Sequence, residues 1–169
     1  EITPTILFPT KRKVEQINNE AMKAISEEEK MFDMKQCDES EVELTQEQKS
    51  MTRELEPTQL DHELNFLKSN INCDLSLMLK KGAQVMCIAN IDVEGTHPIC
   101  NGSQGVIKDF DENGNPIVKF KNGVTRTIGY HVWQSENIPS VAVKQIPLIL
   151  AWAITIHKSQ GATLDFAEI

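Results

Sequence analysis

Hydrophobic positions at the start of the chain first cluster and then recur with a helical period. Residues 5–9 form a short apolar run that ends at a proline, which favours a buried strand. The next apolar positions recur at steps of three and four, which predicts one face of a helix with Thr10 as its cap; they are Val14, Ile17, Ala21, Met22 and Ile25. A strand followed by a helix predicts part of an α/β layer.

The segment of residues 26–65 breaks this pattern because charge replaces the apolar period. It holds 13 acidic and 4 basic side chains and carries the excess negative charge of a chain whose net charge is −8. The rest of the chain is close to neutral, so it can still face phosphates locally. Residues 38–53 have few apolar anchors, and we expect them to be mobile. The acidic run 38–47 is expected to face solvent, and a partner-binding site is the alternative interpretation.

Two ordered elements are expected within and after this charged segment. Residues 30–37 predict a weak strand. A second helix is expected from Pro57, with Thr58 as its cap. Its apolar face would be formed by Leu60, Leu64 and Leu67. Further along, Lys80 and Lys81 precede a glycine turn and are expected to be solvated.

From residue 83 onward the apolar positions alternate, which is the period of a strand. Short alternating runs are separated by three turns, Asn101-Gly102, Asn113-Gly114 and Asn122-Gly123. An Asn-Gly pair between alternating runs is a strong signal for an antiparallel hairpin. Residues 83–128 therefore predict an antiparallel meander, and four or five such strands can close into a small barrel.

Composition narrows the class of protein. No run of about 18 apolar residues occurs, so no membrane contact is expected. The cysteines form no C-x-x-C pair, so we expect reduced, intracellular thiols, in a compartment left open, without a zinc site or a disulfide framework; they are Cys37, Cys73, Cys87 and Cys100. The chain starts at Glu1 and stops at Ile169 within an apolar stretch, and we expect both ends to be boundaries inside a longer protein.

The densest candidate chemistry lies in residues 151–165, where an apolar run leads directly into polar side chains. These side chains are Thr155, His157, Lys158, Ser159 and Gln160, and Gly161 follows them. Hydroxyls, a cation and a glycine after a strand can present donors to a phosphate. The alternatives are a polar surface turn and, for His157, a structural histidine. Trp133 could stack a base or lie in the core, whereas a core position is expected for Trp152.

The sequence of residues 150–165, LAWAITIHKSQGATLD, resembles the fifth motif of the Pif-type DNA helicases, which are superfamily-one enzymes related to RecD and Dda. The resemblance continues upstream, in the family's order, through LKKGAQVM, NGSQGVI, a PxVxF strand and QIPLILAWA. FPTKRKVEQIN resembles the segment that opens the family's second motor domain. Together these segments cover residues 5–25 and 73–169.

The resemblance implies a fold and a function. The fold would be α/β, with residues 1–80 and 144–169 in a partial second RecA-like motor domain and a mobile acidic insertion at about 26–56. Residues 82–143 would form an inserted, small antiparallel Src homology 3-like β-barrel. The chain would be a C-terminal motor-domain fragment of an ATP-dependent helicase that translocates 5′-to-3′ on single-stranded DNA, in DNA repair, recombination or replication. This piece would supply part of the DNA grip and the far wall of the ATP cleft.

The resemblance also implies roles for individual residues. The DNA backbone would be contacted by six residues of two motifs: Thr10, Lys11, Thr155, His157, Lys158 and Ser159. The family often has Asn where this chain has Lys11. Gln160 and Gly161 would lie nearer the nucleotide.

Several parts of the family's catalytic machinery do not occur in these residues. There is no G-x-x-x-x-G-K-[ST] phosphate loop and no paired Asp-Glu for magnesium, and the family's last motif would lie beyond Ile169. No complete catalytic set and no metal site is therefore expected, and these residues alone should be inactive, whereas the parent protein would bind ATP and magnesium. The expected partners are single-stranded DNA, DNA forks and the N-terminal motor domain. Two alternatives stay open: a non-catalytic DNA- or protein-binding module derived from a helicase, and a helicase fused to a conjugative nicking enzyme.

Overall fold

The computed structural model describes residues 2–91, 95, 97–156 and 167–168. These residues form two compact units. Unit 1 comprises Glu1–Met31, Leu77–Gly129 and Pro147–Ile169, and unit 2 comprises Phe32–Ser76 and Tyr130–Ile146. Within the described part of the chain, no helix has the length and apolar character needed to cross a membrane.

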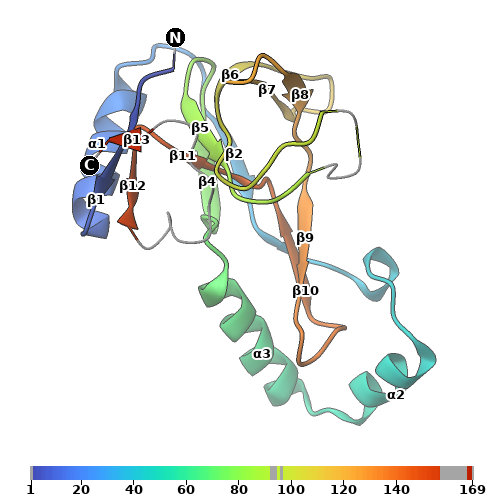
Figure 1. The fold of residues 1–169 in the computed structure, drawn as a ribbon. Coiled ribbons are helices and arrows are strands. Elements are labelled where there is room, and N and C mark those ends of the chain that lie inside the picture. The colour runs from blue at the N-terminus through green and yellow to red at the C-terminus, as the bar shows by residue number, and fades with distance from the viewer. Residues whose placement is uncertain (1, 92–94, 96, 157–166, 169) are drawn as a thin grey trace. The chain divides into compact units, whose positions relative to one another are not determined.

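Unit 1 contains a three-stranded parallel sheet beside one helix (Figure 1). The strand order is β12–β1–β13, and the elements are β1 (Thr5–Phe8), α1 (Lys11–Lys23), β12 (Ala153–Thr155) and β13 (Ala167–Glu168). The apolar stripe of α1 explains its position, because Val14 and Met22 are buried. The strand and helix predicted in residues 5–25 are confirmed.

Unit 1 also contains a five-stranded antiparallel sheet in the order β11–β5–β6–β7–β8. Its strands are β5 (Gln84–Cys87), β6 (Gln104–Phe110), β7 (Pro116–Phe120), β8 (Thr125–Thr127) and β11 (Leu148–Leu150). Gly102, Gly114 and Gly123 have φ angles of 101°, 84° and 90°, which side chains with a Cβ rarely adopt. The predicted meander is therefore confirmed, while its closure into a barrel remains a prediction. A separate pair is formed by β2 (Lys30–Asp33) and β4 (Ser76–Leu79).

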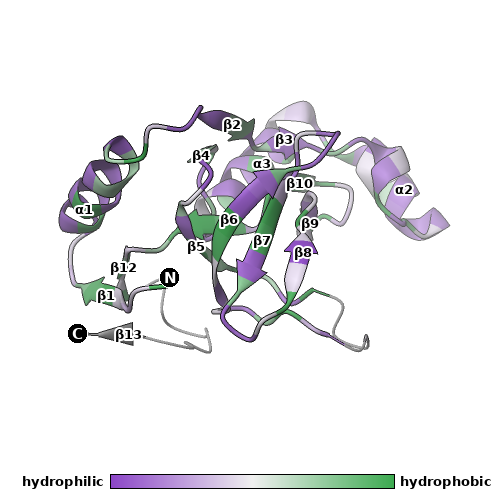
Figure 2. Ribbon diagram, turned by 90° about the horizontal axis from the view of Figure 1, so that it is seen from above, coloured by the Kyte–Doolittle hydropathy of each residue, from purple (hydrophilic) through white to green (hydrophobic). Residues whose placement is uncertain are grey.

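The two sheets of unit 1 share one hydrophobic cluster. Met86 of β5 and Ile149 of β11 pack with Ile154 of β12, and Leu7 of β1 lies against them. Burying a side chain of this size stabilises a fold by about 1.5–3 kcal/mol. Figure 2 shows hydrophobic residues along β1 and β5, whereas α2 of unit 2 is mainly hydrophilic.

Unit 2 is built around a three-stranded antiparallel sheet in the order β3–β10–β9. Its elements are β3 (Lys35–Gln36), η1 (Glu39–Glu41), α2 (Gln46–Glu54), α3 (Pro57–Asn70), β9 (His131–Gln134) and β10 (Ala142–Gln145). The amide of Gln145 donates to the carbonyl oxygens of Phe32 and Asp74 at 2.9 and 3.0 Å. This buried side chain therefore joins three segments of unit 2 that are distant in sequence.

The acidic segment contains more regular structure than its charge pattern predicted. Residues 38–53 contain a 3-10 turn and most of α2, while their expected mobility stays a prediction. Thr45 accepts from the backbone N–H of Gln48 at 3.1 Å, and the Gln48 side chain accepts from the N–H of Thr45 at 2.9 Å. This reciprocal capping box stabilises a helix start without an apolar stripe.

The start of α3 is also set by a capping box. Thr58 was predicted as the cap, but the cap is Glu56, whose N–H donates to the Gln59 side chain at 2.9 Å. Pro57 occupies the first turn, where its missing N–H has no cost. The predicted start of the helix is confirmed, and its expected apolar face is half-buried at Leu60, Leu64 and Leu67.

Lys80 is buried, so the expectation that it is solvated is wrong. Its side chain is 7% exposed and its ammonium donates to the carbonyl oxygens of Met22 and Ile25, both at 2.9 Å. These carbonyls lie at the end of α1, where a cation satisfies acceptors and complements the helix dipole. Lys81 is solvent-accessible as predicted and lies 3.2 Å from Asp109. Trp152, expected in the core, is half-buried.

Candidate nucleic-acid interface

The carboxyl ends of β1 and β12 lie side by side at one edge of the parallel sheet (Figure 1). The two strands are parallel neighbours, and Phe8 pairs with Thr155 at their ends. β1 continues through Pro9 into α1, while β12 continues into residues 157–161. Loops that follow the carboxyl ends of parallel strands meet at one edge of a sheet, which is where α/β folds bind ligands. The structure thus brings the starts of both predicted DNA-contacting segments together.

The first of these segments is the amino-terminal turn of α1. Thr10 is the N-cap residue, with φ −115° and ψ 138°, and its side chain makes no capping hydrogen bond. Lys11, Arg12 and Lys13 follow and are exposed, and the first turn has no acidic residue. Three cations at the positive end of a helix dipole are unfavourable for the helix itself but favourable for an anion. The Lys11–Glu15 pair, at 3.7 Å and largely exposed, offsets little of this charge.

The second segment is described only at its start. Thr155 is the last residue of β12 and is only 9% exposed, so most of its surface at this edge is covered. The other predicted residues lie outside the described part of the chain: His157, Lys158, Ser159, Gln160 and Gly161. The structure therefore places Thr10, Lys11 and Thr155 at one edge, and the proposed roles of all eight residues remain predictions.

Asn18 fixes the position of β12, and sequence reasoning missed it. Its amide donates to the carbonyl oxygen of Ala153 at 2.9 Å and accepts from the N–H of Ala153 at 2.9 Å. The backbone N–H of Ile6 in β1 donates to the Trp152 carbonyl oxygen, so the polar groups of Ala153 point to the other edge of β12, where no strand of the described residues pairs. The Asn18 side chain replaces that missing strand. The available signal was a polar residue midway between Val14 and Met22 on the apolar stripe.

A second buried polar network holds the start of β1. The Thr5 hydroxyl donates to the Ala151 carbonyl oxygen at 2.8 Å and accepts from the amide of Gln104. Gln84 donates to the carbonyl oxygens of Thr3 and Ala151 at 2.7 and 3.0 Å. These hydrogen bonds therefore tie the start of β1 to the first residues of β5 and β6 and to Ala151.

None of the described groups with clearly shifted pKa values is a residue of this edge. Burial raises the pKa of Cys87 to about 11. Burial lowers the pKa of His131, which makes an edge contact with Trp133 at 4.7 Å between ring centroids. Among the described residues, no three His, Cys, Asp or Glu side chains are arranged to hold a metal ion. The chemistry that the described part of the edge can perform is therefore anion binding by donors and fixed cations.

Comparison with known proteins identifies similar sequences. A family model described as the 2B domain of the DNA helicase Pif1 matches residues 63–110. The ATP-dependent DNA helicase PIF1 of Xenopus laevis is 41% identical over 117 residues, covering 65% of this chain and 18% of that relative. The human PIF1 helicase is 44% identical over 97 residues, covering 55% of this chain and 15% of that relative. The chain thus spans less than a fifth of these curated relatives.

Solved helicase structures are similar over nearly the whole chain. Bacteroides Pif1 with ADP-AlF4 is 28% identical, with a TM-score of 0.66, and covers 98% of this chain and 33% of its own. Bacteroides Pif1 bound to single-stranded DNA is 29% identical, with a TM-score of 0.59. The match covers 96% of this chain and 33% of the Bacteroides chain. A structure of two Pif1 helicases at forked double-stranded DNA is 30% identical, with a TM-score of 0.60. The match covers 96% of this chain and 31% of the helicase chain.

Proposed function

We infer the function from the family: the chain is a portion of a Pif1-family DNA helicase, and it includes the region of the family's 2B domain. We propose that this portion supplies part of the single-stranded DNA grip, and the far wall of the ATP cleft, in a protein that uses ATP to translocate 5′-to-3′ on DNA. The observation that supports the proposal is the shared carboxyl edge of β1 and β12, where the starts of the two segments proposed to bind phosphate lie side by side.

The proposed grip consists of two segments with complementary chemistry. The turn at Thr10 and Lys11 offers unpaired helix N–H groups and cations to one phosphate. The segment after Thr155 offers hydroxyls, an imidazole and the Lys158 ammonium to the next. Such contacts hold the DNA backbone without reading its sequence, as a translocating motor requires.

We assign the two proposed domains on the same basis. Residues 1–80 and 144–169 would belong to the RecA-like motor domain, a proposal supported by the parallel sheet and α1. Residues 82–143 would belong to the inserted barrel, a proposal supported by the meander of β5, β6, β7 and β8, whereas β9 and β10 pair in the separate sheet of unit 2. ATP with magnesium would be held mainly by the protein's other motor domain, and Gln160 and Gly161 would lie towards the nucleotide. Single-stranded DNA and DNA forks would be its substrates.

The DNA grip is tested by removing its charges in the full-length protein. Lys158→Ala and Lys11→Ala are each expected to weaken binding of single-stranded DNA about equally for all sequences. Each should also make the plot of log affinity against log salt shallower by about 0.7, the contribution of one phosphate on a single strand. The measurement is a titration of labelled oligonucleotides of several sequences at several salt concentrations.

The matched control is Lys23→Ala, which removes the same charge from the exposed last turn of α1. It should leave the salt dependence unchanged, because it lies at the opposite end of the helix from the sheet edge. If Lys158→Ala and Lys11→Ala both behave like this control while the protein stays folded, the edge does not hold DNA. A non-catalytic binding module would then be the better interpretation.

A second prediction concerns ATP. The 169 residues alone are expected neither to hydrolyse ATP nor to bind it tightly, because they contain no phosphate loop and no carboxylate pair for magnesium. Phosphate release measured with and without single-stranded DNA checks this. DNA-stimulated release by the purified chain would contradict the assignment of the nucleotide cradle to another part of the protein.

A further inference from the structure

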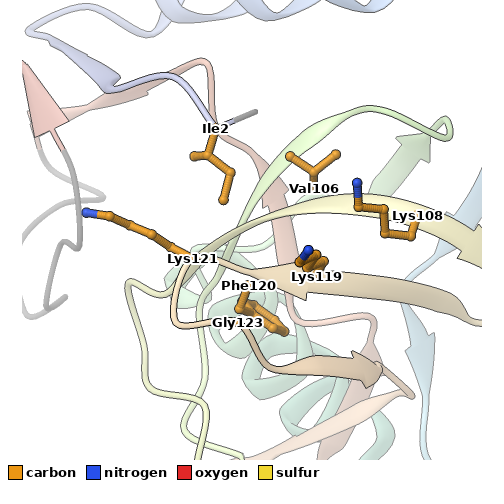
Figure 3. Close-up of a pocket in the computed structure, with 7 residues that line it drawn as sticks. All are labelled: Ile2, Val106, Lys108, Lys119, Phe120, Lys121 and Gly123. Carbon is orange, nitrogen blue, oxygen red and sulfur yellow. The ribbon is translucent and has the colours of Figure 1, made fainter.

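A hollow of about 330 Å³ lies on the outer face of β6 and β7 in unit 1 (Figure 3). We call it the lysine hollow because three of its seven lining residues are lysines; the lining is Ile2, Val106, Lys108, Lys119, Phe120, Lys121 and Gly123. None of these lining residues is acidic. The lysine hollow includes none of the residues of the proposed DNA grip.

The strand register explains why the lysines share one face. Val106 of β6 pairs with Lys119 of β7, and the backbone N–H of Lys121 donates to the Gln104 carbonyl oxygen at 2.9 Å. Side chains alternate between the two faces of a strand, so Lys119 and Lys121 lie on the same face as Val106. Lys108 falls within the register shift between Ile107 and Asp109. Lys108 lines the hollow from this position.

The nearby carboxylate of Asp109 does not neutralise this face, because it has other partners. It accepts from the backbone N–H of Phe110 at 2.8 Å and lies 3.2 Å from the Lys81 ammonium. Both contacts favour the charged form and lower the pKa of Asp109, the backbone hydrogen bond more strongly. The positive face continues onto β8, where Thr125 pairs with Lys119 and is exposed, which adds a hydroxyl donor.

We propose that the lysine hollow binds the phosphate backbone of duplex DNA. The exposed ammonium groups of Lys108 and Lys119 and the hydroxyl of Thr125, on a face with no acidic lining residue, are complementary to a row of phosphates. Many proteins that bind single-stranded DNA add exposed aromatic rings on which the unpaired bases stack, but the lining aromatic, Phe120, is 2% exposed. A duplex keeps its bases paired and stacked and presents rows of phosphates on its outside, so this face, which offers cations and no exposed ring, matches a duplex better than a single strand. The proposal rests on the proposed function in taking DNA as the polyanion, and it concerns a separate surface.

The test uses the full-length protein with the hollow neutralised by Lys108→Gln, Lys119→Gln and Lys121→Gln together. Affinity is measured for a blunt duplex and for an oligo-dT strand, each of about 20 nucleotides per strand, over a range of salt concentrations. Duplex affinity should fall roughly tenfold or more near 0.1 M salt, and its salt slope should become shallower by about two. Oligo-dT affinity should stay unchanged, which also reports that the variant is folded.

The control variant has the same net charge as the triple variant but carries its three substitutions elsewhere, and it should bind duplex like the unmodified protein. Its substitutions are Lys23→Gln, Lys49→Gln and Lys68→Gln.

A single charge reversal, Lys119→Glu, should reproduce the loss of duplex affinity if the triple variant fails to fold. Unchanged duplex affinity in the triple variant, or an equal loss for oligo-dT, overturns the proposal. Displacement of duplex by a polyglutamate peptide at equal charge would also overturn it, because an acidic protein would then fit the hollow equally well. If instead the proposed DNA grip is wrong, Lys158→Ala and Lys11→Ala will leave the affinity for oligo-dT unchanged.

Discussion

Replacing Asn18 by leucine is expected to destabilise unit 1 by about 2–5 kcal/mol, because two buried backbone groups would lose their partner. The side chain is 7% exposed and bonds to both the N–H and the carbonyl oxygen of Ala153. Leucine has a similar size but no polar atom, so the backbone of Ala153 would be left unsatisfied at the open edge of β12. Each buried group left unpaired costs about 1–3 kcal/mol. Urea unfolding of the wild-type and variant chains measures the difference.

Two further variants separate hydrogen bonding from packing. Asn18→Asp keeps the shape but places a second carboxylate oxygen against the Ala153 carbonyl oxygen, so at neutral pH it should be at least as destabilising as leucine. Asn19→Leu makes the same change at an exposed position of the same helix and should be nearly neutral. Hydrogen exchange should also show faster exchange of the Ala153 amide in both Asn18 variants. Equal stability of Asn18→Leu and Asn19→Leu would refute the role assigned to Asn18.

The consequence of losing Asn18 extends to the proposed DNA grip. α1 starts at one DNA-contacting segment, and β12 ends where the other begins. Asn18 is the hydrogen-bonded link between α1 and β12, and we expect it to fix the distance between the two segments proposed to bind phosphate. A misplacement of about 1 Å at a site of this kind can cost a large part of its function. We therefore propose that Asn18 acts as a positioning residue for the grip and not as a contact to DNA.

Elements with a strong local signal could be predicted from the sequence. The Asn-Gly turns require backbone angles that few residue pairs adopt easily, and the strands on either side of them were placed correctly. The helix of α1 followed from an apolar stripe of the right period. By contrast, α2 depends on the capping pair Thr45 and Gln48, a signal of two residues in a charged segment.

Polar residues in the core could not be assigned in the same way. Lys80 and Asn18 are buried because of carbonyl oxygens supplied by other segments, Ile25 for Lys80 and Ala153 for Asn18. The partners of Asn18 are more than a hundred positions away in the chain, and no local pattern encodes them. The sheet edge shows the same division, because its two motifs were visible in sequence while their proximity depends on the pairing of β1 with β12.

Replacing Gly105 by alanine is expected to destabilise unit 1 by about 1–3 kcal/mol, and by valine more, because the added atoms have no space. A Cβ at this position would lie 2.6 Å from Cγ1 of Val118, 2.8 Å from the backbone oxygen of Lys119 and 3.2 Å from Cδ1 of Phe120. A backbone oxygen cannot rotate away, so β6 and β7 would have to separate.

The sign of this effect distinguishes steric exclusion from ordinary propensity. In a strand without steric conflict, alanine is favoured over glycine by roughly 0.5–1 kcal/mol, because glycine loses more conformational freedom on folding. Gly129→Ala provides the matched control, since a Cβ there would meet no atom within 4 Å. Urea unfolding should therefore show Gly129→Ala at or above wild-type stability and Gly105→Ala clearly below it. If the two variants were equally stable, β6 and β7 would not pack as closely as described, and the register that aligns the three lysines of the hollow would lose its support.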